Sequence, residues 1–148
     1  MNVSAILKLK SQTNGPAVVT TASNATVMEA AHKLAQHKIG AVVVVAVDGT
    51  VAGILSERDV VRRLAEAGPD IMSATVRDVM TRNVITCTAD TSVDELMTKM
   101  TRGRFRHLPV VDASGRLTGI VSIGDVVKMH VEEIEHEATA LREYISSH

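Results

Sequence analysis

The sequence predicts an α/β fold of two βαββα repeats packed as a pair with pseudo-two-fold symmetry, with helical extensions at the N-terminus and the C-terminus. The main observation is that residues 18–62 align with residues 84–128 at a constant offset of 66 and without a gap. Fourteen of the 45 aligned positions are identical, and in each copy apolar runs typical of strands alternate with apolar residues at helical spacing. Two copies are too few for a solenoid, so we expect a closed pair.

The first copy reads strand, helix, strand, strand, helix. A short β-branched segment at 17–20 forms the first strand, and a capping box from Thr26 to Glu29 starts the first helix. The continuous apolar run 41–47 is typical of a strand that is buried on both faces. Asp48-Gly49 turns this strand back into another over 51–55, and the second helix follows.

The second copy has the same order, with a capping box from Ser92 to Glu95 and a hairpin turn at Ser114-Gly115. Three segments lie outside the repeat: an amphipathic stretch at the N-terminus, a linker that begins at Gly68, and the C-terminal residues. We therefore divide the chain into an N-terminal helical segment and turn (1–16), repeat one (17–67), a linker with a short helix (68–83), repeat two (84–130) and a C-terminal amphipathic helix (131–148).

The C-terminal segment predicts a helix with one apolar stripe on otherwise charged faces. An isolated helix of about four turns is marginal in water, so the stripe needs a partner. We expect a homodimer in which this helix contributes to the contact, and the alternative is that the stripe folds back onto its own module. The stripe consists of Val131, Ile134, Ala138, Leu141 and Ile145.

Composition argues against several classes of function. The net charge of −1 excludes a nonspecific polyanion binder, and two aromatic residues are too few for a platform that stacks nucleic-acid bases. The longest apolar run, 39–47, is about half of what a membrane span requires. A single cysteine forms no internal disulfide, and the N-terminus lacks a basic segment followed by an apolar stretch. We therefore expect a soluble, cytoplasmic protein without nucleic-acid or membrane partners.

The strongest local signal is a motif in which a strand ends at a serine and an aspartate follows three residues later, at the start of a helix. It runs from Gly53 to Asp59 in the first copy and from Gly119 to Asp125 in the second. One interpretation is a capping box, in which serine and aspartate satisfy the free N–H groups of the helix. The other is a ligand site, in which the helix N-terminus and the serine hold a phosphate and the aspartate accepts hydrogen bonds from a ribose diol. The two interpretations are compatible.

With the segment from Arg104 to Asp112, Arg-Phe-Arg-His-Leu-Pro-Val-Val-Asp, these motifs make the chain resemble a tandem pair of CBS domains, the module named after cystathionine β-synthase. The resemblance implies two repeats packed across a pseudo-two-fold axis. It also implies two clefts that bind adenosyl ligands such as AMP, ADP, ATP, S-adenosylmethionine or a nicotinamide dinucleotide such as NADH. No cofactor beyond such a ligand is expected.

The resemblance also implies roles for individual residues. Asp59 and Asp125 would hold ribose hydroxyls, and Ser56 and Ser122 would lie near ribose or phosphate. The backbone around Val19-Thr20 and Ile85-Thr86 would recognise adenine, and the strand that contains Pro109 would carry basic side chains to the phosphates. The complete set of expected ligand-binding residues is Val19, Thr20, Ser56, Arg58, Asp59, Ile85, Thr86, Arg106, His107, Pro109, Ser122 and Asp125.

The two copies differ where charge matters. Arg106 and His107 align with a Gly-Ala pair of the first copy, so a phosphate-binding pair would come from one copy only. Without the resemblance, Arg106 reads as a solvated strand end and His107 as a core histidine. On a regular strand the two side chains point to opposite faces. We infer either that each addresses a different cleft or that Pro109, which cannot donate to the ladder, distorts the strand.

A second difference lies at Arg58, which aligns with Gly124, so the cleft near Asp59 should be the more cationic. Metal and catalytic sites have no support. The histidine pairs His32/His37 and His130/His136 lack the i, i+4 spacing of metal ligands on one helical face. Cys87 reads as a small packing residue that lies close to the adenine pocket. No nucleophile, base and orienting group can be assembled, so we do not expect an enzyme.

These observations favour a regulatory module that senses cellular adenylate or a related adenosyl ligand by population shift and without turnover. One alternative is an obligate interaction protein with vestigial clefts, which predicts no thermal shift with any adenosyl compound. The other is an enzyme that acts on a nucleotide. The absence of a Walker loop and a nucleophile elbow weighs against that enzyme.

Overall fold

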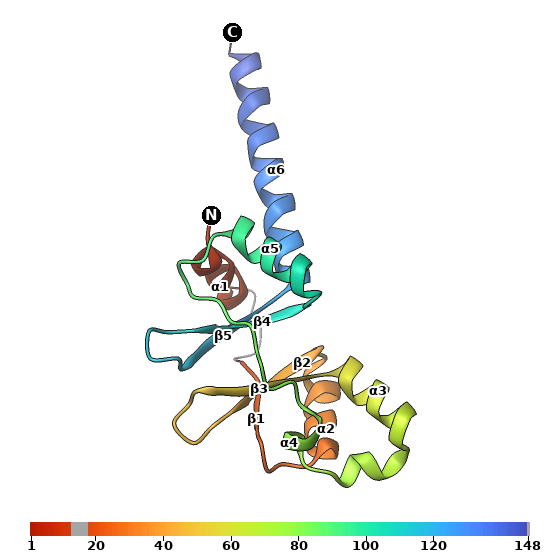
Figure 1. The fold of residues 1–148 in the computed structure, drawn as a ribbon. Helices are drawn as coiled ribbons and strands as arrows, with labels where there is room; N and C mark the ends of the chain where they lie inside the picture. The colour runs from red at the N-terminus through yellow and green to blue at the C-terminus, as the bar shows by residue number, and fades with distance from the viewer. Residues whose placement is uncertain (13–17, 148) are drawn as a thin grey trace.

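The computed structural model describes residues 1–12 and 18–147, and Figure 1 shows two lobes stacked one above the other. The start of the predicted first strand at residue 17 and the turn at 13–16 lie outside the described residues. The elements are α1 (Val3–Gln12), β1 (Thr20–Ala22), α2 (Val27–His37), β2 (Ala41–Val45), β3 (Val51–Ser56), α3 (Glu57–Ala67), the 3₁₀ helix η1 (Pro69–Ser73), α4 (Val76–Val79), α5 (Val93–Gly103), β4 (His107–Val111), β5 (Leu117–Ser122) and α6 (Ile123–Ser146).

The lower lobe in Figure 1 contains repeat one and a sheet of order β1-β2-β3. β1 pairs with β2 in parallel, and β2 pairs with β3 in the antiparallel direction. β2 ends at Val45, two residues earlier than the apolar run predicts, because the register shifts between Val44 and Val45 and the chain enters the hairpin turn. Gly49 has a φ of +85° in this turn, a conformation that glycine adopts without steric cost.

The upper lobe contains repeat two, whose sheet has only β4 and β5. The predicted first strand of this repeat is wrong as a strand, because the segment makes a single parallel bridge between Cys87 and Val110. In repeat one, Val43 N donates to Val19 O at 3.4 Å. The residue that aligns with Val43 is Pro109, which has no N–H and cannot make the equivalent bond. The parallel ladder of repeat two is therefore shorter.

The segments outside the repeat complete the cores of the lobes. Val3 and Ile6 of α1 are buried in the core of repeat two, and Val3 N donates to Thr91 O at 2.9 Å. In the same way, Val76 of α4 is buried in the core of repeat one, and its N–H donates to Ala25 O at 2.8 Å. The N-terminal helix thus packs against repeat two, and the segment that follows repeat one packs back on repeat one.

The C-terminal segment is not a separate helix, because α6 continues without a break from the N-cap Ser122 to Ser146. Its first turns bury Val126 and Met129 in the core of repeat two. The rest of α6 projects away from both lobes in Figure 1. The predicted apolar stripe is exposed along this part, with Ile134 and Ile145 at 53% and 65% exposure.

The two repeats also meet through their hairpins, which point to the same side of the molecule (Figure 1). Leu117 N donates to Gly49 O at 3.1 Å, and Thr50 forms an antiparallel bridge with Arg116. These contacts fix the two sheets relative to each other and leave the ends of β3 and β5 to border the clefts described below.

Candidate functional site

Two clefts lie between the repeats and are related by the 66-residue offset. The first has a volume of about 810 Å³ and the second about 570 Å³. The pair Val84-Ile85 in the first cleft corresponds to Val18-Val19 in the second, and the segment 104–107 corresponds to 38–41. The clefts share a wall made by Gly40, Ala41, His107 and Ser122. The expected pseudo-symmetric pair of clefts is therefore present.

The first cleft, called here the Asp59 cleft, lies at the N-terminus of α3. Ser56 is the N-cap of this helix: Asp59 N donates to Ser56 Oγ at 3.2 Å, and Ser56 N donates to Asp59 Oδ2 at 2.9 Å. The capping-box interpretation is therefore confirmed. The other carboxylate oxygen, Oδ1, accepts a hydrogen bond from Arg62 Nη2 at 3.0 Å. The Arg62 side chain is 66% exposed and also lines the cleft.

The Asp59 cleft is rich in charged side chains. Four arginines line it: Arg58 and Arg62 from α3, and Arg104 and Arg106 from the segment that enters β4. Glu57 and Asp59 are its acidic residues. The basic residues that line the second cleft, besides the shared His107, are Lys10 and Lys38. Among the described lining residues, four arginines and two carboxylates give the Asp59 cleft a formal charge of +2, and two lysines without a carboxylate give the second cleft the same charge. The prediction that the cleft near Asp59 is the more cationic is therefore not borne out by net charge, although that cleft holds more cationic side chains.

Strand β4 begins between Arg106 and His107. Arg106 precedes the strand, is exposed and lines the Asp59 cleft, whereas His107 begins the strand and lines both clefts. The imidazole packs on Gly40, where an added Cβ would lie 3.0 Å from His107 Cε1. The glycine that replaces arginine in repeat one therefore makes room for the histidine of repeat two. Burial lowers the pKa of His107, although the nearby Asp125 and Glu57 carboxylates act in the opposite direction.

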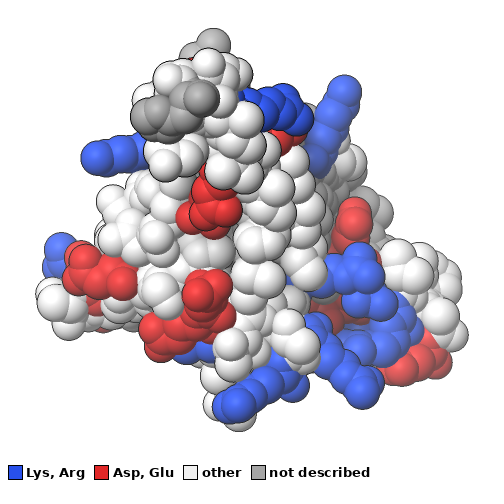
Figure 2. Space-filling view, turned by 90° about the horizontal axis from the view of Figure 1, so that it is seen from above, with Lys and Arg blue, Asp and Glu red and all other residues white. Residues whose placement is uncertain are grey.

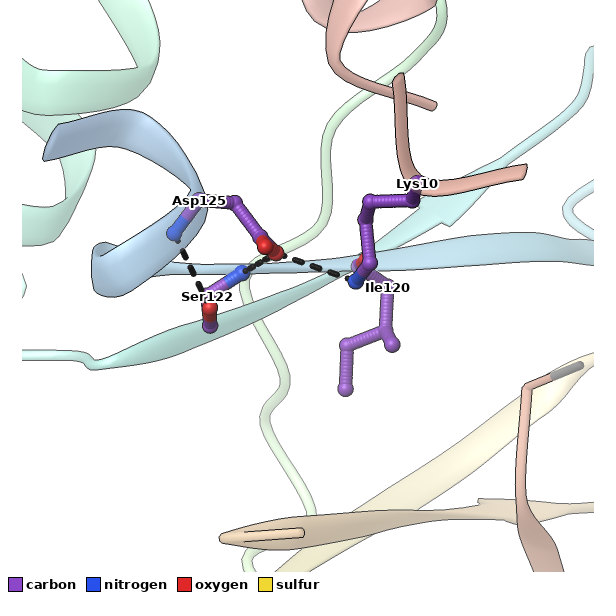
Figure 3. Close-up of polar contacts among 4 residues, drawn as sticks. All are labelled: Lys10, Ile120, Ser122 and Asp125. Carbon is purple, nitrogen blue, oxygen red and sulfur yellow. Dashed lines mark hydrogen bonds and ion pairs between the residues drawn. The ribbon is translucent and has the colours of Figure 1, made fainter. Parts of the chain in front are cut away.

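The second cleft is bordered by α1, which supplies Leu7, Lys10 and Ser11. Ser122 caps α6 as Ser56 caps α3, and Ser122 N donates to Asp125 Oδ2 at 2.8 Å. The same oxygen also accepts a hydrogen bond from Lys10 Nζ at 3.0 Å (Figure 3), and Asp125 is not among the residues that line the second cleft. The two equivalent aspartates therefore have different surroundings.

The structure brings most, but not all, of the expected ligand-binding residues to the clefts. Ser56, Arg58, Asp59, Ile85, Arg106, His107 and Ser122 line the first cleft, and Val19, His107 and Ser122 line the second. Thr20, Thr86, Pro109 and Asp125 line neither. The carbonyls of Thr20 and Thr86 accept hydrogen bonds from the repeat-related Lys33 and Lys99, at 2.6 and 3.2 Å, and the Pro109 carbonyl accepts one from Cys87 N at 3.0 Å.

Sequence reasoning missed Lys10, Arg62 and Arg104. Arg62 has a local signal, because a basic residue three positions after Asp59 on a helix lies on the same face. Arg104 lies two residues before Arg106 in the segment already singled out. Lys10 has no local signal, since it is 115 residues away from Asp125.

Cys87 is a buried packing residue. Burial raises the pKa of its thiol to about 11, and its Sγ lies 3.7 Å from the carbonyl oxygen of Pro109. The thiol is therefore protonated at neutral pH. Within residues 1–12 and 18–147, no group of three His, Cys, Asp or Glu side chains is placed to hold a metal ion.

The face of the molecule that Figure 2 shows does not carry one dominant charge. On the face shown in Figure 2, Lys and Arg gather mainly at one side, with Asp and Glu among and beside them and large uncharged areas between. This mixture agrees with the net charge of −1. In the part of the chain that the structure describes, no helix combines the length and apolarity needed to cross a membrane.

Comparison with known proteins gives the family. The CBS domain model matches residues 15–66 and 76–132. A CBS-domain containing protein from Agrobacterium tumefaciens is 46% identical, with a TM-score of 0.80 over 88% of this chain and 99% of that one. A mitochondrial CBS domain-containing protein of Arabidopsis thaliana is 37% identical over 97% of this chain and 71% of its own length.

Two similar structures contain ligands. A CBS domain protein from Pyrobaculum aerophilum complexed with AMP is 28% identical, with a TM-score of 0.74 over 84% of this chain and 89% of that one. A CBS domain pair in complex with 5′-methylthioadenosine and S-adenosyl-L-methionine is 31% identical, with a TM-score of 0.76 over 90% of this chain and 98% of that one. The chain described here belongs to the CBS-domain family and carries two CBS domains.

Proposed function

We propose that this protein is a regulatory module that binds an adenosine nucleotide in the Asp59 cleft and works without turnover. The observation that carries the proposal is the Asp59 carboxylate at a helix N-terminus, in a cleft lined by four arginines. Support comes from the similar CBS structures that contain AMP or S-adenosyl-L-methionine with 5′-methylthioadenosine.

The geometry suits a nucleotide in three respects. Asp59 Oδ2 is held by the helix cap, while Oδ1 is bound by the exposed Arg62 and can exchange that partner for a ribose hydroxyl. Arg58, Arg104 and Arg106 are donors for phosphate oxygens, and charge-assisted contacts of this kind are strong. Ile85 and Val84 give the cleft an apolar wall against which adenine packs.

The four arginines also favour one class of adenosyl ligand. AMP, ADP, ATP and NADH carry phosphates, whereas the sulfonium group of S-adenosylmethionine is cationic and would be repelled by the arginines. We therefore propose a phosphate-bearing nucleotide as the ligand. A role in sensing the cellular adenylate pool follows from this choice and stays part of the proposal.

The signal would be a shift between conformations of the two repeats. Residues of both repeats form the walls of the Asp59 cleft, namely α3 and β3 from repeat one and the start of β4 from repeat two. A ligand that contacts both walls stabilises the arrangement in which they are close, in proportion to its difference in affinity for the two states.

The proposal is tested by titration calorimetry of AMP and adenosine against the wild-type chain and Arg106→Ala. We expect Arg106→Ala to weaken AMP binding by about 10- to 150-fold, the effect of one hydrogen bond to a charged group, and to change adenosine affinity much less. Arg102→Ala is the matched control, because Arg102 is an exposed arginine that lines neither cleft.

Equal losses for AMP and adenosine would mean that Arg106 shapes the cleft without meeting phosphate. No binding of any adenosine compound to the wild-type chain, and none retained in native mass spectrometry of the purified protein, would contradict the proposed function. That result would favour the alternative of an interaction protein with vestigial clefts.

We also propose that the protein is a homodimer and acts in the cytoplasm. The dimer is supported by the exposed apolar stripe of α6, which a helix in water leaves uncovered only at a cost in free energy. The cytoplasmic location is supported by the single, buried and protonated cysteine, although the similar Arabidopsis protein is named as mitochondrial.

A further inference from the structure

The two repeat-related aspartates differ in which group holds them. Figure 3 shows the Lys10 ammonium between the Asp125 carboxylate and the carbonyl of Ile120, with Nζ 3.0 Å from Asp125 Oδ2 and 2.7 Å from Ile120 O. The Asp125 side chain is only 22% exposed and Lys10 36%. An ammonium group therefore lies at the carboxylate that, in the other cleft, faces the ligand space.

Lys10 is held in this place by the packing of its helix. Val3 and Ile6, on the same helix, are fully buried in the core of repeat two. Leu7 lies directly over Gly119, where an added Cβ would be 2.9 Å from Leu7 Cδ2. Since Gly119 precedes Ile120 on β5, these contacts position the end of α1 over the strand that leads to Asp125.

In the Asp59 cleft the carboxylate is bound by an arginine of its own helix, not by a residue from another element. Arg62 binds Asp59 from the next turn of the same helix, and its side chain is 66% exposed, so it can swing into solvent while Asp59 stays on the cleft wall. Lys10 comes from another element and bonds two groups at once, the Asp125 carboxylate and the Ile120 carbonyl, and Asp125 is not among the residues that line the second cleft. Lys10 binds Oδ2 of Asp125, the oxygen that also accepts from the Ser122 N–H, whereas Arg62 binds Oδ1 of Asp59. A ribose diol that engages both carboxylate oxygens of Asp125 would therefore have to displace the charge-assisted hydrogen bond from Lys10 and leave the ammonium without this partner.

We propose that Lys10 is a tethered occupant of the ribose position at Asp125, so that the second cleft does not accept an adenosine nucleotide and the chain binds one nucleotide, in the Asp59 cleft. This inference rests on the proposed function of the Asp59 cleft. It makes Lys10 the residue that determines how many ligands the module binds.

The test is calorimetry with AMP on four forms of the full chain: the wild type, Lys10→Met, Asp59→Ala and Asp59→Ala/Lys10→Met. Methionine keeps the apolar stem of the lysine and removes the charge. We expect one AMP per wild-type chain, two per Lys10→Met chain, binding at least about tenfold weaker in Asp59→Ala, and one restored site in the double variant. Lys8→Met is the matched control, because Lys8 is an exposed lysine of the same helix, and it should bind one AMP.

Two AMP molecules per wild-type chain, or one per Lys10→Met chain, would overturn the inference and leave the proposed function intact. If no form binds AMP, both the inference and the proposed function are wrong. Should Lys10→Met fail to fold, Asp59→Ala alone decides: AMP binding within tenfold of the wild type would show that the second cleft is open despite Lys10.

Discussion

The two glycines that align at positions 53 and 119 provide a stability prediction with a built-in control. Replacing each by alanine adds the same methyl group to the same position of a repeat-related strand. In Gly53→Ala the new Cβ would lie 2.5 Å from Met80 Sδ and 2.8 Å from the backbone oxygen of Thr81. In Gly119→Ala its nearest neighbour would be the end of the Leu7 side chain, at 2.9 Å.

The contact with the backbone oxygen of Thr81 determines how strongly Gly53→Ala destabilises the fold. Ordinary contacts of a Cβ begin at 3.4 Å, so the Thr81 carbonyl would have to retreat by about 0.6 Å. That carbonyl accepts from Ile54 N at 3.1 Å, and Thr81 N donates to Ile54 O at 2.9 Å, so the movement strains both bonds. Overpacking of this kind costs about 1–3 kcal/mol, and weakening one hydrogen bond adds about 0.5–1.5 kcal/mol. We expect Gly53→Ala to lower the free energy of unfolding by about 2–4 kcal/mol.

Gly119→Ala should cost much less. Leu7 is partly exposed, so its terminal methyl groups can rotate away from the new Cβ. Replacing glycine also restricts the unfolded chain, which stabilises the fold by about 0.4–1 kcal/mol where the backbone conformation permits alanine. The net change should lie within about 1 kcal/mol of zero.

Urea denaturation followed by circular dichroism measures both changes, provided that the m-value stays constant among the variants. Thermal unfolding gives a second readout, in which each kcal/mol corresponds to about 2–4 °C for a chain of this size. If Gly119→Ala proved as destabilising as Gly53→Ala, the reasoning from backbone and side-chain neighbours would be refuted.

Three further predictions concern single features of the fold. Since burial lowers the pKa of His107 below its usual 6.5, the unfolded chain binds more protons just below pH 6.5; the stability that neutral His107 contributes is therefore lost as pH falls through this range. Chemical denaturation from pH 7.5 to 5 should show a weaker pH dependence in His107→Gln, and identical curves would contradict the assignment. The Cys87 thiol, with a pKa of about 11, should resist alkylation at pH 7.5 in the folded protein and react once the protein is unfolded in urea. Mass spectrometry measures the labelling, and rapid labelling of the folded chain would contradict the burial of Cys87. Light scattering should give a dimer for the full chain and a monomer for a chain ending at His130, which keeps the buried Met129; a monomeric full chain would refute the dimer.

Much of the fold could be predicted because its signals are local. The serine caps at Ser56 and Ser122 are interactions over three residues, and both form with the predicted partners. The hairpin turns at Gly49 and Gly115 likewise depend on the conformation of a single residue, and both adopt a positive φ. The prediction of a first strand in repeat two is wrong because Pro109, 22 residues after Cys87, cannot donate a hydrogen bond to that segment. The pattern of a strand does not reveal which segment will pair with it.

In the candidate site, too, the local features could be predicted from the sequence and the long-range contacts could not. The sequence by itself determined that two equivalent motifs, Ser56 to Asp59 and Ser122 to Asp125, cap helices, because each motif contains both partners of its hydrogen bonds. Only the tertiary structure decided that His107 lies between both clefts and that Lys10 binds Asp125. The Lys10 contact depends on the burial of Val3 and Ile6 in the core of repeat two. The apolar residues of α1 predict that one face of this helix is buried, but the hydrophobic effect is not directional, so only the packed structure decides which repeat covers that face.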